Sequence, residues 1–147
     1  MKINILLPYK EKFDENKASS VSITVSNNMR HSKFLDDIRV FGQLTENPMF
    51  QKNFVGIKYS LLSFKSKNNY LADHLSKKLL EENNTNQVVE IHNRPHLVKR
   101  IKKKVNFTHK TTTSVRCILR KHKFELNPTL FIEITLGKLG PDLSRHY

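Results

Sequence analysis

Two polar clusters in the sequence carry side chains suited to binding a sugar or a phosphate. The first comprises His92, Asn93 and Arg94, which follow an apolar run over residues 87–91 and precede Pro95. If the run is a strand and Pro95 opens a helix, these side chains face the crevice beyond the strand, beside the positive end of the helix dipole. The simpler alternative is a strand-to-helix turn in which Asn93 caps the helix and Arg94 is solvated.

The second cluster follows the first apolar run, residues 3–7, and comprises three lysines and two serines: Lys10, Lys12, Lys17, Ser19 and Ser20. Hydroxyl groups and a lysine at the start of a helix can hold an anion. The alternative is a solvated basic loop with ordinary helix caps. The sequence has no GxGxxG or GxxxxGK[ST] motif, so it supports neither dinucleotide nor P-loop nucleotide binding.

Seven histidines and one cysteine raise the question of metal or thiol chemistry. Only His92 and His96 are four residues apart; they flank Pro95, and no carboxylate completes a usual zinc site. Cys117 has no base near it in the sequence that would activate a thiol. We therefore predict no metal site and assign no catalytic residue.

Short apolar runs at residues 3–7, 38–41 and 87–91 predict strands, and the first is typical of a strand buried on both faces. Residues 18–25 are ambiguous. The alternation of Val21, Ile23 and Val25 favours a strand, whereas the spacing of Val21, Val25 and Met29 favours a helix. Local pattern alone slightly favours the strand but does not decide the state of this segment, and residues 44–54 are expected to be a loop.

Two helices are predicted more clearly. Residues 70–82 carry leucines every four residues, with Asn68 or Asn69 available as the N-cap. The second helix has Pro95 in its first turn and a continuous apolar face. The apolar positions of the two helices are Leu71, Leu75, Leu79, Leu97, Val98, Ile101 and Val105.

This alternation of strands and helices predicts an α/β fold, a Rossmann-like parallel sheet with helices on both faces. Ligands of such sheets bind beyond the carboxyl ends of the strands, which here are residues 8–17, 42–43 and 92–94. After Val105 the chain becomes polar and rich in threonine, with a brief apolar patch at residues 114–119 and one more expected strand at 130–136. We assign residues 1–105 to the domain and residues 106–147 to a divergent or truncated, irregular tail of it.

The net charge of +13 favours anionic partners: nucleic acid, anionic lipid or phosphorylated ligands. The densest basic run is on the polar face of the last predicted helix, which is either a solvated surface or a contact with an anionic membrane. The chain has no Trp and no interleaving of aromatic and basic residues, which disfavours a nucleic-acid binder. The basic residues of this run are Lys99, Arg100, Lys102, Lys103 and Lys104.

Residues 1–105 resemble the N-terminal domain of retaining, family-4-type bacterial glycosyltransferases of the GT-B fold. The resemblance rests on the opening MKINILLP, on Ala18-Ser19-Ser20 and on VVEIHNRP at residues 88–95. It implies that Ala18 onward is a helix, and that Lys17, Ser19 and Ser20 line an acceptor cleft with His92, Asn93 and Arg94 at a neighbouring strand end. The family's usual Gly-Gly pair is replaced by Ala18-Ser19-Ser20, and residues 107–109 match its second histidine motif poorly.

The resemblance further implies a cytoplasmic hexosyltransferase of polysaccharide biosynthesis, peripheral to the inner face of the membrane. It would transfer a sugar from a nucleotide-sugar donor to a glycan or lipid-linked acceptor. The family's donor-binding C-terminal domain has no counterpart in these 147 residues, so we expect the chain alone to be inactive. Two alternatives stay open: a small basic nucleic-acid-binding protein, and a non-catalytic Rossmann-like interaction module.

Overall fold

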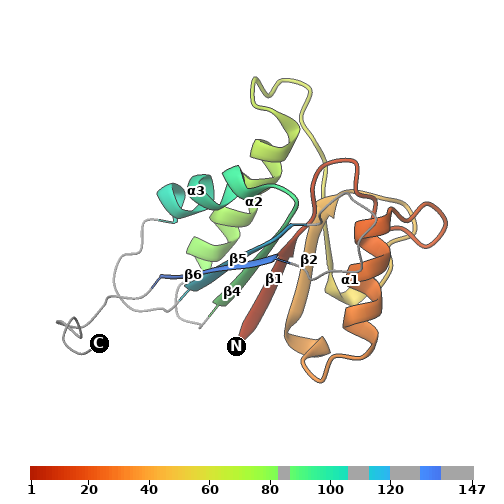
Figure 1. Ribbon diagram of the computed structural model, residues 1–147. Coiled ribbons are helices and arrows are strands. Elements are labelled where there is room, and N and C mark those ends of the chain that lie inside the picture. Colours follow the sequence, from red (N-terminus) through yellow and green to blue (C-terminus); the bar gives the residue numbers. More distant parts are fainter. Residues whose placement is uncertain (83–86, 106–112, 120–129, 137–147) are drawn as a thin grey trace, which may run out of the picture.

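A single six-stranded sheet organises the chain (Figure 1). The computed structural model describes residues 1–82, 87–105, 113–119 and 130–136, the last two segments by their backbone only. The elements in chain order are β1 (Lys2–Leu6), α1 (Ser20–Arg30), η1 (Leu35–Asp37), β2 (Ile38–Gln43), η2 (Gln51–Asn53), β3 (Phe54–Ile57), α2 (Lys67–Glu81), β4 (Gln87–His92), α3 (Pro95–Lys104), β5 (Thr113–Leu119) and β6 (Leu130–Leu136).

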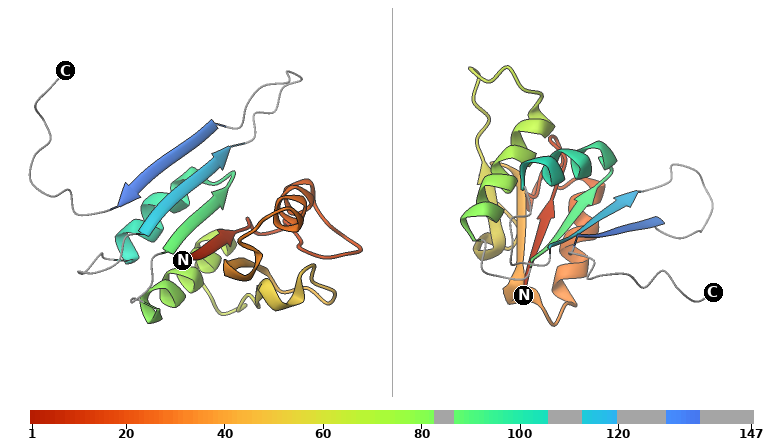
Figure 2. Two further views of the ribbon diagram at one scale, coloured as in Figure 1. Left: turned by 90° about the horizontal axis from the view of Figure 1, so that it is seen from below. Right: turned by 90° about the vertical axis from the view of Figure 1, so that its left-hand side faces the viewer.

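The strand order is β3-β2-β1-β4-β5-β6, and every neighbouring pair is parallel except β5 and β6. β1 lies between β2 and β4, with Leu6 opposite both Phe41 and Ile91. The strands fan out with the usual sheet twist (Figure 2). The predicted α/β fold with a Rossmann-like parallel sheet is therefore confirmed.

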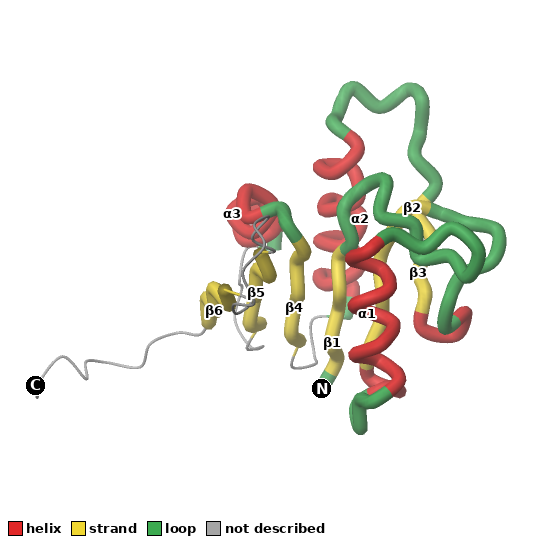
Figure 3. The backbone as a smooth tube through the Cα atoms, turned by 45° about the vertical axis from the view of Figure 1, so that its right-hand side comes forward, coloured by secondary structure: helices red, strands yellow, loops and turns green. Residues whose placement is uncertain are grey.

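Helices cover both faces of the sheet, as predicted (Figures 1 and 3). α2 and α3 bury the leucine and valine positions singled out in the sequence against Leu6, Val89 and Ile91 of the sheet. On the other face, α1 packs Val21, Val25 and Met29 against the odd-numbered apolar residues of β1. Because successive side chains of a strand point to opposite faces, the run at residues 3–7 supplies both layers.

The ambiguous segment at residues 18–25 forms a helix. Val21 and Val25 are buried against the sheet, whereas Ile23, which belongs only to the strand pattern, is exposed. Packing against the sheet thus selects the helical stripe over the strand-like alternation.

Three local expectations need correction. α2 begins at Lys67, and its N-cap is Ser66, whose hydroxyl accepts from the Asn69 amide; neither Asn68 nor Asn69 is the cap. β3 was not predicted, because four residues that include Gly56 carry too little pattern. The strand predicted at residues 130–136 is confirmed as β6, but the apolar patch at 114–119 is also a strand, β5. The other residues of the predicted irregular tail lie outside the described residues.

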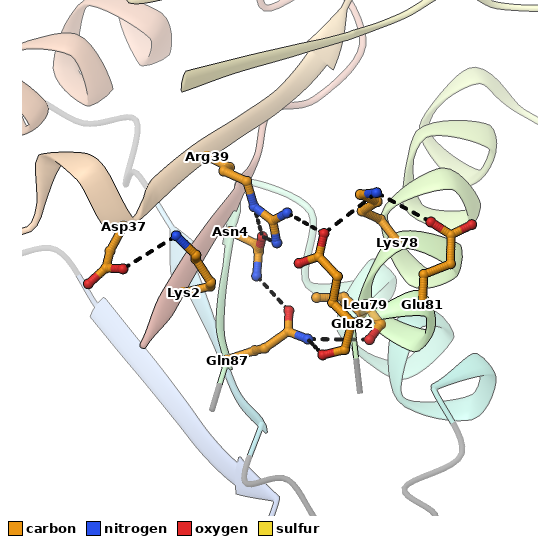
Figure 4. Close-up of polar contacts among 9 residues, drawn as sticks. All are labelled: Lys2, Asn4, Asp37, Arg39, Lys78, Leu79, Glu81, Glu82 and Gln87. Carbon is orange, nitrogen blue, oxygen red and sulfur yellow. Dashed lines mark hydrogen bonds and ion pairs between the residues drawn. The ribbon is translucent and has the colours of Figure 1, made fainter. Parts of the chain in front are cut away.

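A buried polar network ties the amino-terminal part of the sheet to the end of α2 (Figure 4). The fully buried Asn4 donates to Gln87 Oε1 at 3.0 Å and accepts from the guanidinium of Arg39 at 2.7 and 3.0 Å. Gln87 in turn donates to the carbonyls of Leu79 and Glu82, so it caps the last turn of α2. The network thereby links β1, β2 and β4 to one helix.

Asp73 joins α2 to α3. Its carboxylate accepts from Arg100 at 2.8 and 2.9 Å and from Lys65 at 2.7 Å, and Lys104 Nζ lies 3.1 Å away. Burial raises the pKa of Asp73, but the hydrogen bonds from Arg100, Lys65 and Lys104 outweigh burial and hold that pKa well below its ordinary value.

The ion pairs of Asp73 predict that the protein loses stability in acid. A carboxyl group with a lowered folded-state pKa adds stability that is complete above its unfolded pKa, about 3.9, and is lost as the pH falls. We expect Asp73→Asn to lower the free energy of unfolding at neutral pH by about 1.5–3 kcal/mol, the range for a hydrogen bond to a charged group. In urea titrations from pH 7 to 3, the free energy of unfolding should fall less steeply with decreasing pH in the variant than in the native protein. Glu81→Gln, which removes an exposed pair with Lys78, should change the curve little; equal declines in the native protein and in Asp73→Asn would contradict the prediction.

Candidate functional site

The strand order identifies one special position at the carboxyl ends of the strands. The connection from β1 leads to β2 on one side, whereas the later β4 lies on the other side of β1. Connections therefore diverge between β1 and β4. In open α/β sheets ligands bind at this topological switch point, beyond the carboxyl ends of the strands. The segments that start there are the loop after Leu6 and residues 92–94.

The loop after β1 is held by the buried Asp14. Its carboxylate accepts from the backbone amides of Asn16 at 2.9 Å and Lys17 at 3.1 Å, and from the hydroxyl of Thr45. The Thr45 hydroxyl lowers the pKa of Asp14 most, followed by the Asn16 amide. These bonds fix the backbone at Lys17, while the Lys17 side chain is exposed.

Ser19 and Ser20 lie at the start of α1, as the resemblance implies. Ser19 is the N-cap: its hydroxyl accepts from the Ser22 amide at 3.3 Å and donates to the Ser22 hydroxyl at 3.0 Å. Ser20 is exposed in the first turn. Of these two serines, Ser20 is the exposed one, and the hydroxyl of Ser19 serves the helix.

His92 ends β4 and pairs with Glu90. Its Nε2 lies 2.6 Å from Glu90 Oε1, and the residue is 5% exposed. Val89 and Ile91 face α2 and α3, so the alternation along the strand puts Glu90 and His92 on the α1 side of the sheet. With Glu90 as the acceptor, Nε2 carries a proton, and Nδ1 is the ring nitrogen left for another partner. The histidine and the start of α1 thus share one edge and one face.

Unusual backbone conformations mark the same edge. Among the described residues, three non-glycine residues have a positive φ: Lys10 (81°), Phe50 (49°) and Asn93 (52°). Lys10 follows β1 and Asn93 follows β4, so two of the three flank the switch point. Asparagine tolerates this region, whereas lysine is strained there, and such strain is concentrated at functional sites.

Arg94, not Asn93, occupies the N-cap position of α3, and the Arg94 side chain makes no capping hydrogen bond. The capping role that the simpler alternative gave to Asn93 is therefore wrong. The guanidinium of Arg94 donates to the Asn93 carbonyl at 2.8 Å, which folds it back along the turn at the end of β4.

Sequence reasoning missed an aromatic and cationic group beside the site. Lys67 Nζ donates to the Tyr9 hydroxyl at 3.0 Å and lies 4.4 Å from the centre of the Tyr9 ring. The Tyr9 amide donates to Asn68 Oδ1 at 2.7 Å, which anchors the first residues of the loop to α2. The only local signal was Tyr9 directly after Pro8, because Lys67 is 58 positions away.

Among the described residues, no group of three or more His, Cys, Asp or Glu side chains is arranged to hold a metal ion. No helix in the described part of the chain has the length and apolarity needed to cross a bilayer. Comparison of the chain with protein-family models, with curated proteins and with solved structures finds no match. A function is therefore inferred from the side chains at the switch point.

Proposed function

We propose that this chain is the acceptor-binding, N-terminal part of a glycosyltransferase, and that a sugar bearing a phosphate binds at the switch point between β1 and β4. One observation carries the proposal: the loop that leads to Lys17, Ser19 and Ser20 and the segment 92–94 follow two adjacent parallel strands, β1 and β4, at this edge. In open α/β sheets that position is the usual ligand site.

The side chains at the edge suit a hydroxylated and anionic ligand. His92, oriented by Glu90, offers a hydrogen-bonding ring nitrogen for a sugar hydroxyl. Lys17 and Arg94 supply positive charge, and the start of α1 adds backbone amides and the positive end of a helix dipole. The lack of a glycine-rich phosphate loop argues against a nucleotide as the ligand of this edge.

The donor nucleotide-sugar would bind mainly to a second domain, which the resemblance implies and these residues do not contain. The sugar would then pass across the cleft between the two domains. The 147-residue chain alone is expected to transfer no sugar from any nucleotide donor.

Saturation-transfer NMR with glucose 1-phosphate, glucose and UDP tests the proposal. We expect glucose 1-phosphate to receive saturation most strongly, and Lys17→Gln with Arg94→Gln to weaken its binding about tenfold, equivalent to roughly 1.4 kcal/mol. Lys33→Gln with Lys52→Gln removes the same charge away from the switch point and should leave binding within about twofold.

Two results would contradict the proposal. One is a lack of saturation transfer to glucose and glucose 1-phosphate, as a non-catalytic interaction module would give. The other is an equal loss in the two double variants, which would indicate a general charge effect. Transfer of sugar by the isolated chain would overturn the assignment of the donor site to another domain.

A further inference from the structure

The loop between β3 and α2 exposes three large apolar side chains in four residues. Leu61 is 94% exposed, Leu62 is 88% exposed, and Phe64 is fully exposed. The other exposed large apolar residues of the described chain, such as Ile23, Phe34 and Leu44, are about half-buried by comparison and are scattered. In Figure 1 this loop projects past the amino-terminal end of α2, away from the body of the sheet. Isolated exposed leucines are ordinary, but a projecting cluster indicates an interaction site.

Hydrogen bonds and ring contacts define the shape of this loop. The Tyr59 hydroxyl lies 3.0 Å from the Ser63 carbonyl and 2.9 Å from the Lys65 carbonyl. The Tyr59 ring packs edge-on against Tyr70 of α2, with the ring centres 5.1 Å apart. The base of the loop is therefore anchored to the domain, while its apolar tip has no cover.

A basic surface on α2 and α3 is linked to the loop that carries this tip. α2 and α3 form a pocket of about 540 Å³ that no acidic side chain lines. Lys65 of the loop and Arg100 of the pocket both pair with the carboxylate of Asp73, which links the base of the loop to the pocket. Among the described residues, Lys99 and Lys103 have no acidic partner. The residues that line the pocket are Asn69, His96, Lys99, Arg100, Lys103 and Lys104.

We infer that the tip (Leu61, Leu62 and Phe64) and the basic pocket together form a surface that docks on an anionic phospholipid bilayer. The apolar tip inserts below the lipid head groups, and the cations beside it contact the phosphates. Charge complementarity selects this occupant, because Asp73 balances one of the three cations that surround it and Lys99 and Lys103 are unbalanced. The apolar tip distinguishes it from a nucleic-acid surface, for which cations alone would suffice.

The native chain contains no Trp, so a single introduced Trp reports on one position. We expect the emission of Phe64→Trp to shift to the blue on vesicles made of equal parts of phosphatidylcholine and phosphatidylglycerol. Phosphatidylcholine vesicles alone should give a much smaller shift. Phe34→Trp, placed beyond α1, should show no shift on either kind of vesicle.

Co-sedimentation with the same vesicles separates the two parts of the surface. Both Leu61→Ser/Leu62→Ser/Phe64→Ser and Lys99→Glu/Lys103→Glu should lower the bound fraction at least about tenfold, because insertion and charge are both needed. The controls Phe34→Ser/Leu44→Ser and Lys33→Glu/Lys52→Glu should bind like the native chain. All the replaced side chains are exposed, so unchanged thermal melting is expected and shows that the variants fold.

Three outcomes would overturn the inference. The emission of Phe64→Trp could remain unshifted while the protein sediments with the vesicles. Its emission could instead shift without lipid as the protein concentration rises, which would identify a second copy as the occupant. Finally, the native protein could bind duplex DNA but no vesicles, and Lys99→Glu/Lys103→Glu could abolish that DNA binding. The sugar-phosphate experiment is done without lipid and uses other residues, so each proposal can fail alone.

Discussion

Phe13→Ala should lower the free energy of unfolding by about 3–5 kcal/mol, the range observed when a buried phenylalanine is truncated to alanine. Phe13 is completely buried in the loop between β1 and α1, and its ring stacks on Phe54 at 5.7 Å and on Phe50 at 6.4 Å between ring centres. It belongs to the apolar layer under α1, which it joins from a loop that is otherwise polar. Removing the ring leaves a cavity that the surrounding strands cannot close.

Urea unfolding followed by circular dichroism measures this effect directly. Phe34→Ala is the matched control: Phe34 is 43% exposed, so its truncation should cost well under half as much. Because Met49 donates its amide to the Phe13 carbonyl, hydrogen exchange at Met49 should also become faster in Phe13→Ala. A loss below about 1 kcal/mol would mean that the loop does not depend on this anchor, since surface truncations fall in that range.

Asn4→Leu should lower the free energy of unfolding by about 3 kcal/mol, because it leaves buried polar groups without partners at about 1–3 kcal/mol each. Without the amide, Gln87 Oε1 loses its donor and two nitrogens of Arg39 lose their acceptor. Leucine has the same number and branching of side-chain heavy atoms as asparagine, so the change removes hydrogen bonds without opening a cavity.

Asn4→Asp provides the graded comparison. A carboxylate still accepts from Arg39 but cannot donate to Gln87, so its loss of stability should be smaller than that of Asn4→Leu. Adding Gln87→Leu to Asn4→Leu should cost less than the sum of the single changes, because contacting residues are energetically coupled. Strict additivity in urea unfolding would show that the two side chains act independently and would contradict the network.

The Asn4 network and the candidate site lie at opposite ends of the same strands. Asn4, Arg39 and Gln87 are near the amino-terminal end of the sheet (Figure 4), whereas His92 is the last residue of β4. In parallel α/β sheets ligands bind at the carboxyl ends of the strands, whereas residues at the amino ends contribute mainly to stability. Asn4→Leu is therefore expected to change stability but not the affinity for glucose 1-phosphate at temperatures where the protein is folded.

The fold class and the central elements could be inferred from local sequence patterns. A strand buried on both faces must be apolar throughout, as residues 3–7 are, and a helix on a sheet must repeat its apolar residues every three or four positions, as α2 and α3 do. These are local consequences of burial, so they can be read without knowing the partners. The polar residues at the strand ends, among them His92 and Lys17, could be located in the same way.

The strand order, the state of α1 and the existence of β3 depend on contacts between residues far apart in the chain. Strand order places β1 between β2 and β4 and so creates the switch point, and order depends on pairings between residues far apart in the chain. The helical state of α1 was settled by a sheet surface that buries Val21 and Val25, and β3 exists because β2 supplies its hydrogen bonds. The contact of Lys67 with Tyr9 and the link from Lys65 through Asp73 to Arg100 and Lys104 likewise require the folded chain, because spacing along a sequence does not give distances across a sheet.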